Sequence, residues 1–259
     1  MKDMKANYHT HTKRCGHATG TMEEYIINAI EAGYKVLGFS DHAPFPGVVQ
    51  EGIRMTYDML DSYIQEFQRL KEKYQDQIEL HIGLEAEYVE KFEDYYRYLL
   101  KEKGIEYLLL GQHCFINDDN QFEWYGRSRA YKRVEDMIKG IKSGLFSYCA
   151  HPDIFIDENS IHTKQTREFT KQIIEASIEN DCPLEINAEG ICHAFRLEIE
   201  EYYPYPSFWK RVSKTKAKVL IGVDAHKADA FKSVFVKECY RIADQCNVKL
   251  IDTIEFKKV

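Results

Sequence analysis

The feature that most constrains the fold of this 259-residue chain is a strand–helix alternation that repeats seven times. Short apolar runs, such as residues 35–40 and 107–111, are each followed by a segment with apolar residues at helical spacing. The first of these helices is expected to begin at the capping box of Thr21 and Glu24 and to end at Gly33. Strands separated by helices pair in parallel and are covered on both faces. The sequence therefore predicts an α/β fold, either a barrel or a doubly wound sheet.

The same pattern gives the order of the remaining elements. We expect further strands over residues 78–83, 146–150, 184–187, 218–222 and 250–255, and helices over residues 58–74, 92–103, 131–143, 164–180, 207–214 and 228–246. Two long loops are expected, one around residues 118–126 and one from the strand at 184–187 to Pro204 and Pro206. No low-complexity tract or linker divides the chain, so a single domain over residues 1–259 is the simplest interpretation.

Composition excludes several classes of protein. A net charge of −7 and a pI near 5.8 argue against a nucleic-acid or anionic-membrane binder. Because there is no run of 18 apolar residues, signal peptide or lipidation motif, a soluble, cytoplasmic protein is expected. The seven cysteines lack CxxC spacing, which is typical of reduced, buried thiols.

Metal-ligand and acid/base side chains lie at the ends of seven expected strands, which are the extended segment with His9 and His11 and the next six strands along the chain. His9 and His11, at i and i+2 in an extended segment, point to the same side of it. The full set at these strand ends is His9, His11 and His17; Asp41 and His42; Glu85; His113; His151 and Asp153; Asn187 and Glu189; and Asp224 and His226. Ligands bind at this edge of parallel α/β folds, so we interpret the set as a polynuclear metal site. For His81, inside a strand, and His162, in a loop, we favour a structural role.

The donor types indicate the metal. Imidazoles and carboxylates without a thiolate cluster suit Zn, Mn or Fe(II). One ion does not need so many ligands, so two or three divalent ions are indicated, and a carboxylate that bridges two ions would explain the single Glu85 on its strand. Such sites activate water and bind the attacking and leaving oxygens of a phosphoryl group.

These segments together carry a resemblance to a known family. They are His9-Thr-His11, Cys15-Gly-His17-Ala, Ser40-Asp-His-Ala-Pro44, Gly83-Leu-Glu85, Gln112-His113, His151-Pro-Asp153 and Gly222-Val-Asp-Ala-His226. In this order the chain, from residue 7 to about residue 230, resembles the polymerase-and-histidinol-phosphatase (PHP) superfamily, and within it the single-domain histidinol-phosphatase family. The resemblance implies a distorted (β/α)7 TIM-like barrel with a trinuclear site at the C-terminal ends of the strands.

The resemblance also implies which residues bind each ion. His9, His11, Glu85 and Asp224 would hold the first ion; Glu85, His113 and His151 the second; and His17, His42 and His226 the third. The implied reaction is hydrolysis of L-histidinol phosphate to L-histidinol and phosphate, a step of histidine biosynthesis, through a metal-bridging hydroxide. Besides His42, Asp41 and an arginine are the expected catalytic residues, with Asp41 either supporting a ligand or acting as an acid/base group.

The arginine that binds phosphate is less well defined. Arg196 is the nearest match to the family arginine after the sixth strand, although more residues than usual separate it from Asn187. Arg54 also resembles a family position, and Arg127, Arg129 and His193 are further candidates for substrate contact. For the imidazole and ammonium of the substrate, the candidate neighbours are Tyr125, Trp124, Phe195 and Glu189.

Three other functions are compatible with parts of the pattern. A PHP-type phosphoesterase could act on another small phosphoester, such as a nucleotide, a sugar phosphate or a cyclic phosphodiester, and the unusual arginine loop favours this alternative. A metal-binding domain without catalysis would be expected to lack a ligand, and none is missing. A metal-dependent amidohydrolase would need a bridging lysine at the end of the fourth strand, where His113 stands instead. The sequence does not define the oligomeric state.

Overall fold

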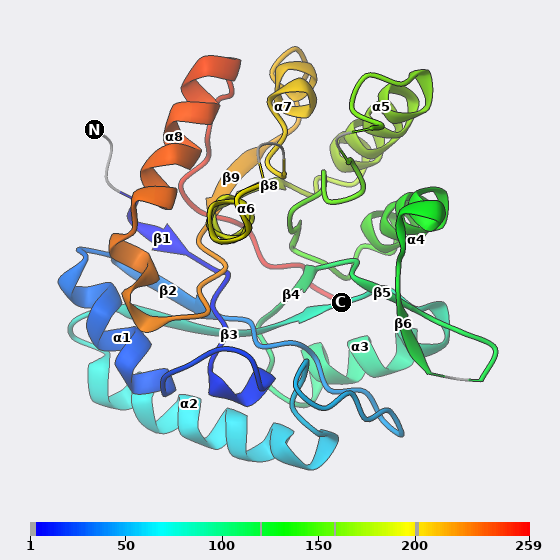
Figure 1. Cartoon of the computed structure of the whole chain (residues 1–259). Helices are drawn as coiled ribbons and strands as arrows, with labels where there is room; N and C mark the ends of the chain where they lie inside the picture. Colours follow the sequence, from blue (N-terminus) through cyan, green and yellow to red (C-terminus); the bar gives the residue numbers. More distant parts are fainter. Residues whose placement is uncertain (1–3, 120, 158, 200–201) are drawn as a thin grey trace.

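Seven parallel strands form the centre of the fold in the computed structural model, which describes residues 4–119, 121–157, 159–199 and 202–259 (Figure 1). In the order in which they pair, they are β1 (Ala6–Asn7), β2 (Val36–Phe39), β3 (Glu79–Ala86), β4 (Tyr107–Leu110), β7 (Tyr148–Cys149), β8 (Leu184–Asn187) and β9 (Val219–Gly222). Strands that are neighbours in this order are connected through helices, so the predicted parallel α/β architecture is confirmed.

The sheet curves until its two edges meet. β1 and β9 do not pair as strands, but Thr10 and Ala225, just beyond them, form a parallel bridge. The His11 amide donates to the Ala225 carbonyl at 2.9 Å, and the buried Asn7 side chain accepts a hydrogen bond from the Val223 amide at 2.9 Å. The result is a nearly closed, seven-stranded barrel, as the resemblance implied.

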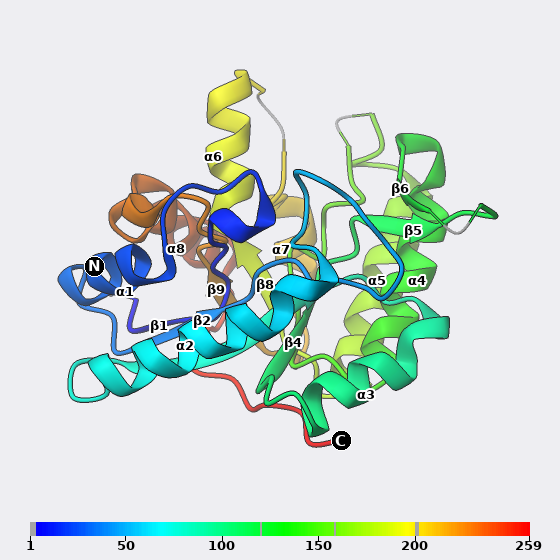
Figure 2. The same ribbon diagram turned by 90° about the horizontal axis from the view of Figure 1, so that it is seen from below.

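Helices surround this barrel as an outer layer, except for α6, which lies inside the ring of helices in Figure 1 and projects away from the strands in Figure 2. The α-helices are α1 (Met22–Glu31), α2 (Leu60–Tyr74), α3 (Glu93–Lys101), α4 (Ala130–Lys142), α5 (Lys164–Glu179), α6 (Ala188–Leu197), α7 (Pro206–Val212) and α8 (Val234–Cys246). Short 3-10 turns lie at η1 (Lys13–Cys15), η2 (Tyr57–Met59), η3 (Glu90–Phe92), η4 (Arg127–Arg129) and η5 (Ala228–Lys232). The predicted capping box of Thr21 and Glu24 begins α1. None of the helices in the described part of the chain combines the length and apolar character that a membrane span needs.

The inside of the barrel is apolar at one end. Tyr107 is fully buried there, and its hydroxyl donates to the carbonyls of Tyr8 and Phe39 at 2.8 and 2.9 Å. The ring of Phe256, near the C-terminus, stacks on Tyr107 with a centroid distance of 5.0 Å. This packing fills the end at which the strands begin, so an open site can lie only where the strands end.

Three segments differ from the expectations. The prediction of a loop after residue 187 is wrong for residues 188–197, which form helix α6. The Asn187 side chain accepts a hydrogen bond from the Gly190 amide at 2.9 Å and so caps the start of this helix. The loop around residues 118–126 contains an antiparallel hairpin, β5 (Cys114–Ile116) and β6 (Phe122–Trp124). The prediction of a strand over residues 250–255 is also wrong. Leu250 makes a single bridge to Val219, the Ile251 amide donates to the Val219 carbonyl at 2.8 Å, and no ladder continues beyond them in the described residues.

Candidate metal centre

Four ligand-type atoms from both edges and the middle of the sheet converge at the mouth of the barrel. His9 Nε2 lies 3.4 Å from Glu85 Oε2 and 3.3 Å from Asp224 Oδ1. His11 Nε2 lies 3.3 and 3.1 Å from the same two oxygens. Four ligands about 2.0–2.1 Å from a tetrahedral ion stand about 3.3 Å apart, which is the spacing of this group.

A second group shares Glu85 through its other carboxylate oxygen. Glu85 Oε1 lies 3.0 Å from His151 Nε2 and 3.6 Å from His113 Nε2, and the two imidazole nitrogens are 3.2 Å apart. Glu85 Oε2 belongs to the first group, so one carboxylate faces two groups of imidazoles. This is the arrangement that a carboxylate bridging two ions would need.

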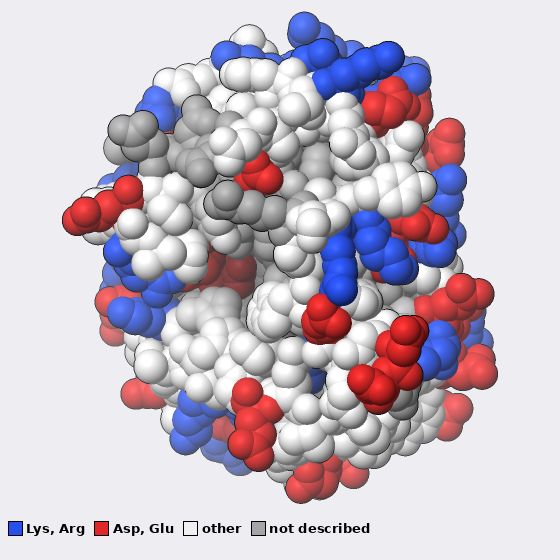
Figure 3. Space-filling model, turned by 45° about the vertical axis from the view of Figure 1, so that its right-hand side comes forward, with Lys and Arg blue, Asp and Glu red and all other residues white. Residues whose placement is uncertain are grey.

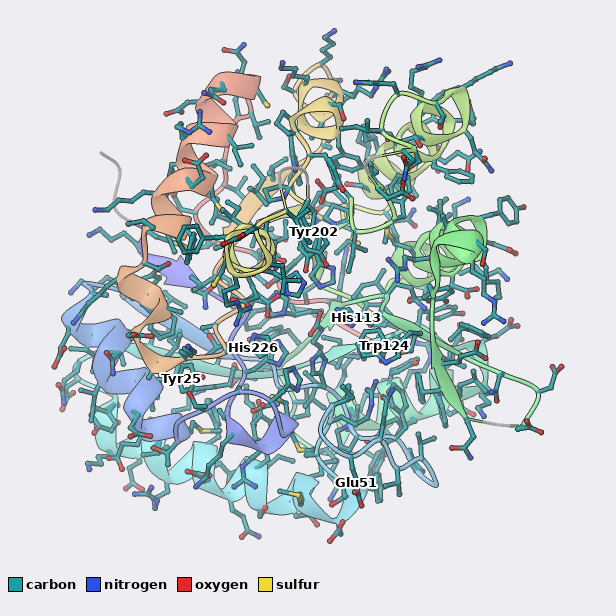
Figure 4. The ribbon with its side chains drawn as sticks, viewed as in Figure 1. Tyr25, Glu51, His113, Trp124, Tyr202 and His226 are labelled. Carbon is teal, nitrogen blue, oxygen red and sulfur yellow. The ribbon has the colours of Figure 1, made fainter. Side chains whose placement is uncertain are left out.

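A third group consists of His17, His42 and His226, whose ligand atoms lie within 4.8 Å of one another. The Nε2 atoms of His17 and His226 are 3.0 Å apart. His42 connects this group to the first, since its Nδ1 lies 3.1 Å from Glu85 Oε2. The structure thus brings all nine predicted ligand residues together in three neighbouring groups (Figure 4 labels His113 and His226).

The protonation of these groups fits divalent cations. His9 Nε2, His11 Nε2 and Asp224 Oδ1 are buried without a hydrogen-bond partner, which is costly unless a cation binds there. Burial, then the charge of His11, lowers the pKa of His226 to about 3, so this imidazole is neutral as a ligand must be. Burial opposes a charge on His11, but Asp224 and Glu85 outweigh it and raise its pKa to about 9. A bound cation would replace that proton.

Glu185 orients this centre, and sequence reasoning missed it. Its Oε1 lies 2.9 Å from His9 Nδ1, and its Oε2 accepts from the His151 amide at 3.2 Å and from Asn187 Nδ2 at 2.9 Å. The glycine at 222 leaves room for it, since a Cβ there would lie 1.7 Å from Glu185 Oε1. The sequence signal that could have identified Glu185 is a carboxylate between the apolar residues Leu184 and Ile186 of strand β8.

Asp41 lies next to the centre, and its carboxylate is bound by Thr12. Its two carboxylate oxygens accept from the Thr12 amide at 2.7 Å and the Thr12 hydroxyl at 2.8 Å. Burial raises the pKa of Asp41 to about 6. Of the two roles expected for this residue, these contacts favour support of the segment that carries His11 over acid/base catalysis.

Arg54, predicted as a substrate contact, is held by buried or partly buried partners. Its side chain is almost fully buried, and its guanidinium donates to Glu87 Oε1 at 3.0 Å, to the Ala43 carbonyl at 2.9 Å and to Gln50 Oε1 at 2.8 Å. Glu87 Oε1 in turn lies 3.7 Å from His113 Nδ1. Arg54 therefore acts on the centre only through Glu87, a second carboxylate that sequence reasoning missed.

Arg196 is the predicted arginine whose side chain lines a cavity next to a ligand residue. It is half exposed on α6, forms an ion pair with Glu189 and lines a cavity together with His226. Burial, then the charge of Asp224, raises the pKa of Glu189 to about 7.

Two of the other predicted substrate contacts, His193 and Arg129, pack against neighbouring side chains. His193 stacks on Tyr202 with a centroid distance of 5.1 Å. Arg129 is half exposed, pairs with Glu123 and covers the Phe115 ring of the hairpin, and the side chain of Arg127 is outside the part that the structure describes.

Figure 3 shows a hollow in the surface with Asp or Glu residues inside it. In Figure 4, Trp124 lies beside His113, and Tyr202 lies on the α6 side of the mouth. The Trp124 ring is half exposed, with its centroid 6.0 Å from that of His113. Apolar and aromatic groups thus border a centre that is rich in imidazole and carboxylate, as a site for a small polar molecule requires.

The model of the PHP domain family matches residues 7–189, which is more than half of the chain. The chain belongs to this family, and the resemblance seen in its motifs is confirmed.

Two relatives are similar over most of their length. A protein of Deinococcus radiodurans named "Probable histidinol-phosphatase" is 27% identical over 242 residues, which cover 87% of this chain and 91% of that protein. A protein of Bacillus subtilis named "Histidinol-phosphatase" is 29% identical over 257 residues, which cover 86% and 94% of the two chains.

A solved structure has the same fold. It is a histidinol phosphate phosphatase of Lactococcus lactis subsp. lactis in complex with zinc, L-histidinol and phosphate. It superposes with a TM-score of 0.73 at 17% identity and covers 98% of this chain and all of that one. At this identity the likeness concerns the fold.

Proposed function

We propose that this protein is a metal-dependent phosphomonoesterase that hydrolyses L-histidinol phosphate to L-histidinol and phosphate, a step of histidine biosynthesis. The observation that carries the proposal is the convergence of nine imidazole and carboxylate residues on three adjoining groups, with the two oxygens of Glu85 facing different groups. Its substrate is taken from the relatives, whose names are those of histidinol phosphatases.

The residues divide into ligands and supports. His9, His11, Glu85 and Asp224 would hold one ion, Glu85, His113 and His151 a second, and His17, His42 and His226 a third. Such divalent ions neutralise charge on phosphoryl oxygens and lower the pKa of water. The candidates are Zn, Mn and Fe(II).

The phosphate is expected to contact Arg196, whose guanidinium can bind two of its oxygens. Glu185 holds the His9 ring so that Nε2 faces the centre, and Glu87 lies beside Nδ1 of His113. Both supports are buried, so the imidazoles are oriented before any substrate enters.

The test combines metal analysis with an activity panel. The protein would be purified with Zn, Mn or Fe(II), its metals counted, and phosphate release measured from L-histidinol phosphate and from nucleotide, sugar-phosphate and cyclic esters. We expect two or three ions per chain, a preference for L-histidinol phosphate, and a loss of activity of at least about 1,000-fold in Glu85→Gln. The control His162→Ala changes an exposed histidine outside the three groups and is expected to retain full activity.

Another small phosphoester is the second candidate substrate. Arg54 is paired with Glu87, so among the described predicted arginines Arg196 is the one that lines the cavity beside His226, and a single arginine is compatible with many phosphoesters. Turnover of another small phosphoester with none of L-histidinol phosphate would support that class. Fewer than two ions and no turnover of any ester would contradict an enzyme.

A further inference from the structure

Beside the metal centre, α6 carries a pair of opposite charges that opens onto a cavity. Glu189, in the first turn of the helix, forms an ion pair with Arg196 in its last turn. The side chain of Glu189 is 19% exposed and that of Arg196 is 47% exposed. Both line a cavity of about 570 Å³ whose wall includes His226 of the third group and the apolar side chains of Phe195, Val234 and Phe235.

The start of α6 is held firmly against the centre. Asn187, which begins the helix, donates from Nδ2 to Asp224 Oδ2 at 3.1 Å and accepts from the Gly190 amide at 2.9 Å. Glu189 lies between these two residues in sequence. Its carboxylate is therefore anchored close to the reacting groups but is not part of any ligand group.

Glu189 differs from the other carboxylates near the centre, each of which already has buried partners. Glu185 binds His9, Glu87 binds Arg54, and Asp41 binds Thr12. Asp153 accepts from the Tyr205 amide and from Trp209 Nε1. Of these carboxylates and the ligands Glu85 and Asp224, Glu189 alone lines this cavity. Lys227, Asp229 and Lys232 also line it but are exposed, whereas Glu189 is partly buried.

A second cavity contains a guanidinium. It holds about 200 Å³ and is lined by Arg133, Tyr125, Ile154 and Tyr202, with Asp157 at its wall. Arg133 donates to the carbonyls of Ile154 and Tyr125, and in the described residues it has no ion pair with a carboxylate. A guanidinium without a described ion pair repels an ammonium group bound beside it.

We propose that Glu189 is the counter-ion for the ammonium group of the substrate, which makes the site selective for phosphoesters of amino alcohols. This inference rests on the proposed phosphatase function and adds a residue that determines specificity. In an ester such as L-histidinol phosphate, the amine is on the carbon next to the one that carries the phosphoryl oxygen. A phosphate at the metal centre therefore places the ammonium within a few ångströms of it.

The ion pair on α6 has one positive and one negative group, and such a substrate has a negative phosphate and a positive ammonium group. A bound zwitterion offers its phosphate to Arg196 and its ammonium to Glu189, so each member of the pair exchanges one charged partner for another. Exchange of partners avoids leaving a partly buried charge unpaired. An ester without an amine would engage Arg196 and leave Glu189 without a cation, which costs binding energy.

The experiment compares Glu189→Gln with the wild type on two substrates that differ only in the amine. These are L-histidinol phosphate and its deamino analogue, 3-(imidazol-4-yl)propyl phosphate. We expect the substitution to lower kcat/KM for the amine at least about 10-fold more than for the analogue, with most of the change in KM. The control Glu198→Gln changes an exposed carboxylate at the other end of α6 and is expected to leave the ratio as it is in the wild type.

Two results would overturn the inference. An equal loss on both substrates would show that Glu189 acts on the centre or on a proton rather than on the amine. No loss on either substrate would show that Glu189 does not contact the amine at all.

The inference and the proposed function fail in different ways. If L-histidinol phosphate is not hydrolysed, ethanolamine phosphate and ethyl phosphate serve as the pair. Dependence of their ratio on Glu189 would then support the inference without the function. If no ester is hydrolysed, calorimetry with L-histidinol decides: at least about 10-fold weaker binding to Glu189→Gln supports the inference, and equal binding overturns it.

Discussion

At the scale of single residues, the centre depends on buried carboxylates that do not face the cations themselves. Glu185 contacts His9, the His151 amide and Asn187, so one side chain orients parts of two proposed ion sites. Such partners set the tautomer of a ligating imidazole and raise its basicity. Their removal should therefore affect metal binding while the ligands themselves remain.

We predict that Glu185→Gln weakens zinc binding by about 10- to 100-fold, because the neutral amide no longer stabilises the His9 ring as a carboxylate does. Competition with a chromophoric chelator measures the affinity. Glu175→Gln, at an exposed position on α5, is the control. Equal affinities in the two variants would contradict the role of Glu185.

A second carboxylate, remote from the centre, tests the structural role of His81. Burial opposes ionisation of Glu106, but hydrogen bonds from His81 and Lys71 outweigh it, so its pKa is lower than 4.5. The stability that this group contributes is therefore present above pH 4.5 and is lost as the pH falls through its lowered pKa.

We predict that Glu106→Gln lowers the free energy of unfolding by about 1 kcal/mol at pH 7 and by much less near pH 3. Urea unfolding of the metal-free protein at both pH values measures the difference from the wild type. A difference that is the same at both pH values would show that the charge of Glu106 does not contribute.

At the scale of elements, α6 is the helix whose position matters most for the site. Gly190 packs so closely on Tyr203 that a Cβ would lie 2.4 Å from both the ring and the carbonyl oxygen of that residue. The Tyr203 ring also lies near His151, with a centroid distance of 5.6 Å. A small residue at 190 thus lets the first turn of α6, with Glu189, approach the centre.

We predict that Gly190→Ala lowers the free energy of unfolding by about 1–3 kcal/mol through overpacking and also weakens substrate binding. Gly126→Ala is the matched control, since a Cβ there would meet only Ser128 Oγ, at 3.9 Å. Chemical unfolding and KM are the readouts. An effect no larger than that of the control would mean that α6 tolerates a shift away from Tyr203.

At the scale of the whole molecule, closure of the barrel and assembly of the centre are one event. Asn7 is fully buried; it donates to the His9 carbonyl and the Thr10 hydroxyl and accepts from the Val223 amide. It therefore joins the first and last strands directly below His9, His11 and Asp224. Separation of these edges would take His9 and His11 away from Asp224.

We predict that Asn7→Leu lowers the free energy of unfolding by about 3 kcal/mol, because buried backbone groups lose their partners, and that it reduces the number of bound ions. Unfolding curves and metal analysis after gel filtration measure both effects. A variant that loses stability but retains every ion would separate closure of the barrel from assembly of the centre.

The limits of sequence reasoning are seen in the two strand-end arginines. Arg54 and Arg196 both follow expected strands, and nothing in the local sequence shows that Glu87 binds the first and that the second reaches the cavity beside His226. Glu185 and Glu87 were missed for the same reason: neither belongs to a motif, and their importance comes from His9 and Arg54, which are distant in the chain. Helix α6 was missed because its N-cap, Asn187, was interpreted only as a site residue.

By itself, the sequence determined the strand–helix alternation, the capping box at Thr21 and the positions of nine imidazole and carboxylate residues at strand ends, because these depend on local spacing and side-chain chemistry. Only the tertiary structure decided which of them share a group. His17 and His226 are 209 positions apart and meet at 3.0 Å because the sheet curves until its edges join. Curvature and burial come from packing over the whole barrel, and they also decide which charged side chains are paired inside and which remain open to a substrate.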